Sequence, residues 1–294
     1  MTTVLLVRHG LTATTGQLLT GWTPGVGLDE RGRAQAKALG ERLASIPLDA
    51  IVTSPLDRCR QTVEEIVAAR GGPAGQDARQ GKGDPVVEDR VGECKYGDWT
   101  GQRLDDLVKD PLWPVVQAHP SAVRFPGAAG ETMLDMQHRA VSAVREWNER
   151  LGKAATYLIC SHGDVIKAIV ADSLGLHLDQ CQRIVADPCS LTVIRYTPLR
   201  PFLLRLNDTG GGVDDLLPPP PAQTQPAEEP PAQTRPAQEP AAQAGPGRPG
   251  GDTLSRESDA VIGGRVGSTG AVASATADPA GPAQVADTAH GAEG

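Results

Sequence analysis

Two histidines in this sequence each follow an apolar run and precede a glycine. His9 comes after Arg8 and the apolar residues 4–7, and His162 comes shortly after the apolar residues 157–160. A neutral imidazole can attack phosphorus, and a glycine beside it lets the backbone approach a ligand closely. Two such histidines, with an arginine adjacent to one of them, therefore indicate a site for phosphate chemistry.

The elements that carry these residues are predicted from the spacing of apolar side chains. Residues 4–7 and 157–160 are continuous apolar runs, typical of strands buried on both faces, and residues 49–53 are predicted to form a third strand. Ser54 is predicted to cap a helix whose first position is the proline that follows it. Arg58 then lies in the first turn of that helix, close to the end of the strand at 49–53.

The remaining pattern predicts an α/β fold. Helices are expected at 28–43, at 133–150 and directly after His162, and two edge strands at 191–196 and 202–206. Strands that alternate with helices predict a three-layer sandwich with a largely parallel central sheet. Ligands bind at the carboxyl ends of such strands, where free N–H groups of a helix start also attract anions.

The composition divides the chain into a folded domain, residues 1–209, and a tail, residues 210–294. The tail contains no Phe, Trp, Tyr, Cys or Lys and is rich in Pro, Ala, Gly and Gln. Such a segment buries too little apolar surface to offset its ordering entropy, so we expect it to be disordered. Its Pro-rich start could recruit a weak protein partner as a polyproline helix, although a passive solubilising role is the simpler expectation.

Charge and cysteine content limit the function classes. Residues 211–294 carry four Arg and eleven acidic residues, which is −7 of the total −8, so the folded part is nearly neutral. A general nucleic-acid binder usually has a net basic face, which argues against that class. No apolar stretch is long enough for a membrane span and the N-terminus does not resemble a secretory signal, so we expect a cytoplasmic protein. The five cysteines have no CxxC spacing and are expected to be reduced, buried thiols.

Four motifs resemble the histidine phosphatase superfamily, which has the phosphoglycerate mutase-like fold. They are RHG at 8–10, LDRCRQT at 56–62, GECKYGDWTG at 92–101 and SHGD at 161–164. A single RHG triplet would be a weak signal, but the four motifs occur in the family's order and on the expected elements. The resemblance covers roughly residues 2–208.

The resemblance implies a role for each matching residue. His9 corresponds to the phosphate acceptor, Glu93 to the proton donor, and Arg8, Arg58 and His162 to the phosphate pocket. Five further positions fall where the family contacts phosphate or substrate, namely Thr12, Thr15, Thr20, Gly21 and Gly163. The implied reaction passes through phosphohistidine and uses no cofactor. His162 and Asp164 would be only two ligands for a metal, so no metal site is predicted.

Three functions are compatible with these residues. The implied primary function is hydrolysis of a small phosphorylated metabolite. A phosphomutase of the phosphoglycerate mutase type is the first alternative, but such mutases carry a longer insertion with paired arginines between the positions of Glu93 and His162, and no Arg-Arg pair occurs there. A non-catalytic phospho-ligand binding module is the second alternative. The segment 102–126 is expected to form a short lid, with Lys109, Trp113, His119 and Arg124 as generic contacts.

Overall fold

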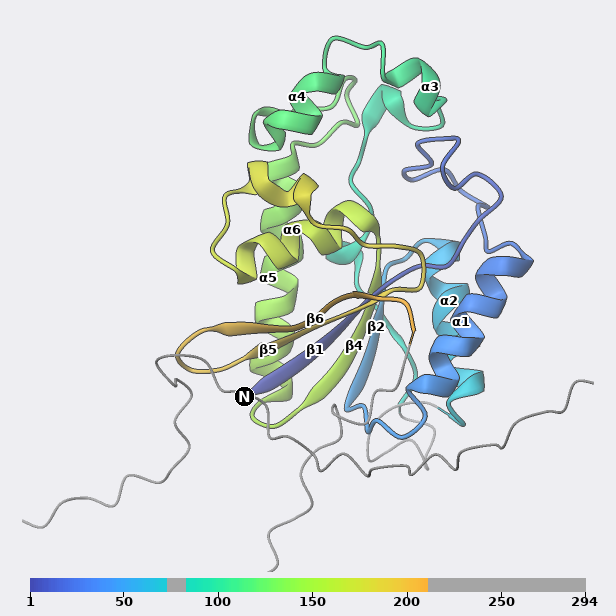
Figure 1. Ribbon diagram of the computed structural model, residues 1–294, viewed down its shortest axis with the longest axis vertical. Helices are drawn as coiled ribbons and strands as arrows, with labels where there is room; N and C mark the ends of the chain where they lie inside the picture. Colours follow the sequence, from blue (N-terminus) through green and yellow to red (C-terminus); the bar gives the residue numbers. More distant parts are fainter. Residues whose placement is uncertain (73–82, 211–294) are drawn as a thin grey trace, which may run out of the picture. The chain divides into compact units, whose positions relative to one another are not determined.

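The computed structural model describes residues 1–72 and 83–210, and most of the expected tail lies outside these residues. At the centre is a six-stranded sheet with the order β3-β2-β4-β1-β5-β6 (Figure 1). The strands are β1 (Thr2–Arg8), β2 (Ala50–Thr53), β3 (Val86–Val87), β4 (Thr156–Ser161), β5 (Leu191–Tyr196) and β6 (Pro201–Asp208). The pairs β3-β2, β2-β4 and β4-β1 are parallel, whereas the pairs β1-β5 and β5-β6 are antiparallel, which confirms the largely parallel sheet.

One predicted edge strand is in fact an interior strand. β5 pairs with β1 on one side and with β6 on the other, so of these two strands only β6 lies at an edge. The reason is its burial: the first four residues of β5, Leu191 to Ile194, are all buried. Consecutive buried residues are typical of an interior strand of a sheet covered on both faces, whereas the side chains of the edge strand β6 are half-exposed.

Helices cover both faces of the sheet, as predicted (Figure 1). On one face lie α1 (Glu30–Arg42) and α2 (Asp57–Ala69), and on the other lie α5 (Met133–Leu151) and α6 (Gly163–Ser173). Successive side chains of β1 alternate between the two cores. Leu5 and Val7 pack in one buried cluster with residues of α1 and α2, and Val4 and Leu6 pack in the other with residues of α5 and α6.

The predicted start of α2 was wrong by a few residues. The helix begins at Asp57, with Leu56 at the N-cap and no side-chain cap hydrogen bond. The Ser54 hydroxyl, which was expected to cap it, instead lies 2.8 Å from Nε2 of His162 and accepts a hydrogen bond from the Leu56 N–H. Arg58 remains in the first turn of α2, as predicted.

The segment that carries α3 (Leu104–Leu107) and α4 (Trp113–Ala118) forms a lid at the carboxyl ends of the parallel strands (Figure 1). Four 3₁₀ helices complete the described elements: η2 (Asp89–Val91), η3 (Gly97–Trp99) and η4 (Pro120–Ala122) precede α5, and η5 (Leu178–Arg183) follows α6. The loop after β1 is joined to the lid by an isolated bridge between Leu18 and Arg103. The lid and that loop therefore form two walls over the strand ends.

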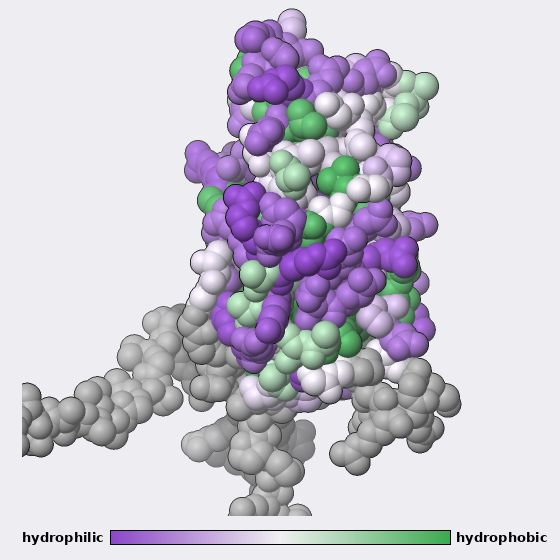
Figure 2. All heavy atoms as spheres, turned by 90° about the vertical axis from the view of Figure 1, so that its right-hand side faces the viewer, coloured by the Kyte–Doolittle hydropathy of each residue, from purple (hydrophilic) through white to green (hydrophobic). Residues whose placement is uncertain are grey.

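The outer surface beside α1 and α2 is mostly hydrophilic, with apolar side chains in scattered patches (Figure 2). All five cysteines are buried free thiols, as expected. None of the helices in the part of the chain that the structure describes is long and apolar enough to cross a membrane.

Candidate active site

The two histidines meet because their strands are neighbours. β1 and β4 pair in register so that Arg8 lies opposite Ser161, and His9 and His162 follow directly. The backbone N–H of His9 donates to the Ser161 carbonyl oxygen over 3.0 Å. The two imidazole ring centres are 5.2 Å apart. The convergence predicted from two His-Gly strand ends is confirmed.

The hydrogen bonds of His9 define its tautomer. Nδ1 lies 2.8 Å from the carbonyl oxygen of Gly10, which can only accept, so Nδ1 carries the proton. Nε2 then presents its lone pair. Burial, followed by the positive charges of Arg58 and Arg8, holds the pKa of His9 well below its ordinary value. The imidazole is therefore neutral near pH 7, and Nε2 is its unprotonated, nucleophilic nitrogen.

Arg58 is the cation that touches both histidines. From the first turn of α2 its Nε donates to Nε2 of His9 over 3.2 Å, and its Nη2 lies 3.2 Å from Nδ1 of His162 and 2.9 Å from the Gly21 carbonyl oxygen. The side chain is nearly completely buried. A buried guanidinium placed over the nucleophilic nitrogen is suited to hold an anion there.

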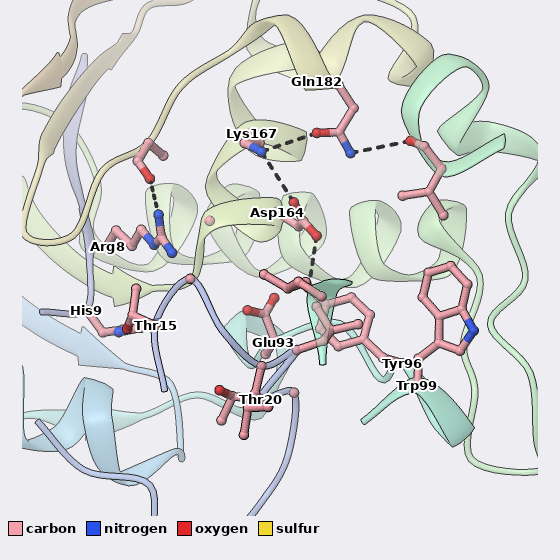
Figure 3. A pocket seen from close by; sticks show the side chains of 18 of the residues that line it. Arg8, His9, Thr15, Thr20, Glu93, Tyr96, Trp99, Asp164, Lys167 and Gln182 are labelled. Carbon is pink, nitrogen blue, oxygen red and sulfur yellow. Dashed lines mark hydrogen bonds and ion pairs between the residues drawn. The ribbon is translucent and has the colours of Figure 1, made fainter. Parts of the chain in front are cut away.

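Arg8 lines the same pocket from the end of β1 (Figure 3). Its Nη1 donates to the Ala186 carbonyl oxygen over 2.7 Å, which fixes the guanidinium. Its Nε is buried and has no hydrogen-bond partner among the described residues. A buried donor of this kind is costly unless a ligand accepts from it, so the orphan Nε marks an anion position. Within residues 1–72 and 83–210 no three His, Cys, Asp or Glu side chains are grouped to hold a metal ion.

Glu93 is held by its backbone, while its carboxyl group faces the pocket (Figure 3). Its carbonyl oxygen accepts from Trp22 Nε1 at 2.6 Å and from Arg139 at 2.9 Å. The carboxylate accepts from the Cys94 N–H, and its second oxygen lies 3.6 Å from His162. Burial, and next the negative charge of Asp164, raise the pKa of Glu93 to about 7. Such a carboxyl group can both give and take a proton near neutral pH.

His162 is completely buried and lies behind Arg58 rather than on the pocket lining. A guanidinium only donates, so Nδ1 of His162 accepts from Arg58 and the protonated Nε2 donates to the Ser54 hydroxyl. Burial, and then Arg58, lower the pKa of His162 well below its ordinary value. The imidazole is neutral and connects Ser54 to the guanidinium.

The remaining predicted contacts all line the pocket, which has a volume of about 560 Å³. They are Thr12, Thr15, Thr20, Gly21 and Gly163. The hydroxyl groups of Thr12 and Thr15 lie 2.9 Å apart, and Thr14 bridges Thr12 to Thr20 through contacts of 3.1 and 3.0 Å. These four hydroxyls form one hydrogen-bonded chain. Of the four expected lid contacts, only Trp113 lines the pocket; Lys109, His119 and Arg124 do not.

Sequence reasoning missed a polar chain beside Glu93. Asp164 accepts from the Tyr96 hydroxyl at 2.9 Å and lies 3.5 Å from Lys167, which donates to Gln182 (Figure 3). Asp164 and Lys167 are three residues apart, so they share one face of α6. The spacing of three residues from Asp164 to Lys167 could have indicated this pair. No local sequence pattern connects Gln182 or Tyr96 to it.

The family is decided by a comparison over most of the chain. The family model described as histidine phosphatase superfamily (branch 1) matches residues 4–209. The chain belongs to the histidine phosphatase superfamily. That result confirms the resemblance read from the four motifs and agrees with the fold and the placement of His9.

Individual relatives include both phosphatases and mutases. The chain is 28% identical over 190 residues to phosphoserine phosphatase 1 of Hydrogenobacter thermophilus, covering 62% of this chain and 81% of that protein. It is 30% identical over 190 residues to a 2,3-bisphosphoglycerate-dependent phosphoglycerate mutase of Brucella melitensis, covering 60% and 84%. Among solved structures, Bacillus stearothermophilus YhfR superposes with a TM-score of 0.60 at 29% identity, covering 71% of this chain and 98% of that one. The alpha-ribazole phosphatase of Shigella flexneri has the same fold, with a TM-score of 0.60, 22% identity and coverage of 72% and 99%.

Proposed function

We propose that this protein is a histidine phosphatase that hydrolyses a small phosphorylated metabolite through a phosphohistidine on His9. The observation that carries the proposal is the state of His9 Nε2. It has a lone pair, belongs to a neutral ring and lies 3.2 Å from a buried guanidinium. A nucleophile beside a fixed cation is what an incoming phosphate monoester requires.

The first half of the reaction uses His9, Arg8, Arg58 and Glu93. Nε2 of His9 attacks phosphorus, and the bond from phosphorus to the leaving oxygen breaks. Glu93 gives its proton to that oxygen, so the product leaves as a neutral alcohol. The two guanidiniums, with His162 behind Arg58, stabilise the charge on the transferring group; a preorganised donor of this kind contributes about 3 kcal/mol.

The second half regenerates the enzyme. Water attacks phosphorus, the bond between Nε2 and phosphorus breaks, and the carboxylate of Glu93 takes the proton from the water. Inorganic phosphate leaves, and His9 and Glu93 return to their starting states. The carboxyl pKa of about 7 supports both roles of Glu93, since a group that titrates near the working pH is both an effective acid and an effective base.

A phosphomutase is the second candidate, because the Brucella melitensis relative is a phosphoglycerate mutase. Hydrolysis is better supported by the charges of the pocket. Beyond Arg8 and Arg58, the only cation among the described pocket-lining residues is Lys167, which is paired with Asp164. A mutase substrate with a carboxylate would find no unpaired cation there.

We assign the activity to residues 1–209, the segment that the family model spans almost completely. We also propose a cytoplasmic location, which the five buried free thiols support. Arginine side chains supply the positive charge in this mechanism, so the proposed reaction needs no metal ion.

The test is covalent labelling of the purified full-length chain. A radiolabelled phosphate monoester, quenched in alkali where phosphohistidine survives, should label the wild-type protein on His9. His9→Ala should lose the label and about three orders of magnitude or more in turnover. His119→Ala is the matched control, because that histidine is exposed and lies outside the pocket. Label on another residue, or full turnover by His9→Ala, would overturn the proposal; isomerised phosphoglycerate without free phosphate would favour the mutase.

A further inference from the structure

Besides the phosphate-binding residues, the pocket is lined by large apolar side chains. We call this surface the apolar wall: Leu18, Leu19, Leu104, Trp113 and Val185. The first four are half-buried, and Val185 at the rim is 54% exposed. Large apolar side chains that are partly exposed inside a pocket favour an apolar ligand, because the ligand removes their apolar surface from water.

Aromatic packing and backbone hydrogen bonds hold the apolar wall in place. Trp113 packs near Trp99 at a ring distance of 6.2 Å, and Trp99 packs edge-on against Phe125 at 5.5 Å. Trp99 and Phe125 are almost completely buried. The Leu19 and Leu104 segments are fixed by backbone hydrogen bonds, from Leu19 N–H to the Gln102 carbonyl and from Leu104 N–H to the Gln17 carbonyl. A ligand would thus meet a preformed surface and would not have to order it.

The charges of the same region disfavour a leaving group that carries a carboxylate. Arg8 and Arg58 are at the phosphate position, which leaves Lys167 as the other cation among the described lining residues. Its ammonium group lies 3.5 Å from Asp164 and donates to Gln182 over 3.2 Å (Figure 3). The pair is neutral as a whole. A carboxylate on the substrate would have to displace Asp164 and would then lie beside it.

We infer that the substrate is a phosphate monoester with a bulky apolar leaving group, such as an aromatic or branched aliphatic body. A small carboxylate-bearing ester such as a three-carbon phospho-acid would leave the apolar wall uncovered. The volume of about 560 Å³ lies within the range of pockets that enclose a whole drug-sized ligand. This inference rests on the proposed hydrolase function and specifies which esters the site selects.

A homologous series of n-alkyl phosphates tests the inference with the full-length protein. The basicity of the leaving alkoxide is nearly constant from ethyl to pentyl phosphate, so a trend in kcat/KM reports contact with the apolar wall. Each buried methylene contributes up to about fourfold, and we expect at least about a tenfold rise across the series. O-phosphoserine and 3-phosphoglycerate, measured in parallel, should fall below pentyl phosphate. A flat series, or faster turnover of either acid, would overturn the inference.

The same assay distinguishes failure of the inference from failure of the proposed function. Labelling of His9 by p-nitrophenyl phosphate does not depend on an alkyl chain. Label on His9 together with a flat alkyl series would reject only the substrate class. Absence of label and of all turnover would reject the hydrolase itself, and the inference with it.

Variants then assign the preference to the apolar wall. Val185→Ser should lower the ratio of kcat/KM for pentyl over ethyl phosphate by about twofold to fourfold, and Trp113→Ala should lower it further. Leu199→Ser is the matched control, because Leu199 is also 54% exposed but does not line the pocket. If Trp113→Ala does not fold, Val185 and Leu199 still give the comparison. An equal ratio in the wild type and the Val185 variant would show that the preference arises elsewhere and overturn the assignment.

Discussion

Replacing Glu93 by glutamine isolates the proton that this residue is proposed to transfer. The side chains have nearly the same shape, and the glutamine oxygen can still accept the Cys94 N–H hydrogen bond at 2.9 Å. The backbone contacts from Trp22 and Arg139 to residue 93 do not involve the side chain. Glu93→Gln should therefore keep the pocket and remove only the transferable proton.

The pKa sets the size of the effect. Burial raises the pKa of Glu93 from 4.5 to about 7, a difference worth about 3 kcal/mol between its two protonation states. About half of the wild-type enzyme then carries the proton at pH 7, against roughly 0.3% for an ordinary glutamate. Loss of a positioned acid typically costs about 10²–10⁴ in rate when the leaving group needs a proton.

The assay compares kcat/KM for an alkyl phosphate and for p-nitrophenyl phosphate between pH 7 and 9, where both esters are mainly dianions. For the wild type, the alkyl ester should slow by nearly tenfold per unit above pH 7, as Glu93 loses its proton. The nitrophenyl ester should change little, since nitrophenolate leaves without one. Glu93→Gln should remove the pH dependence for the alkyl ester and lower its rate by about 10²–10⁴, with a much smaller loss for the nitrophenyl ester. Equal losses on both esters, or a pH dependence that survives in the variant, would refute the role of Glu93.

Two further predictions concern pH-dependent stability and metal ions. Because the folded-state pKa of Glu93 is raised, the native state binds more protons than the unfolded state between pH 4.5 and 7, so this residue makes stability fall as pH rises through that window. Urea unfolding should accordingly show Glu93→Gln to be more stable than the wild type by about 1–3 kcal/mol at pH 8 and equally stable at pH 4. A variant less stable than the wild type at pH 8 would contradict the raised pKa. Turnover should persist in excess EDTA, because Arg8 and Arg58 supply the charge that metal ions supply elsewhere, and loss of activity restored by a divalent ion would contradict this.

The sequence was most informative where one local pattern determined the position of a residue. Continuous apolar runs identified β1 and β4 as buried strands, and the residues after them converge because parallel strands end at one edge of the sheet. Arg58 was placed correctly in the first turn of α2, although the expected cap was wrong, because the helix begins only a few residues after Ser54. These features depend only on short segments of sequence, so they could be predicted without knowledge of the tertiary contacts.

Predictions failed where a distant partner decided the outcome. Ser54 has the sequence context of a helix cap, but its hydroxyl forms a hydrogen bond with His162, which lies 108 positions later in the sequence. The position of β5 inside the sheet depends on pairing with both β1 and β6. β3 is two exposed valines, too short to show any periodicity. Propensity describes what a segment can do alone, and tertiary contacts select among those options.

The high pKa of Glu93 is itself a consequence of how the residue is held. Hydrogen bonds to a carboxylate stabilise its charged form and lower its pKa, so an acid positioned through its own oxygens would lose its proton. Here the positioning contacts from Trp22 and Arg139 go to the backbone carbonyl, and among the described residues the carboxylate itself accepts a hydrogen bond only from the Cys94 N–H. The side chain is thus fixed in place but weakly solvated, and burial then favours the protonated form. The backbone is fixed, and the carboxyl group has few hydrogen-bond partners. The site therefore has an acid that is ordered and still partly protonated near pH 7.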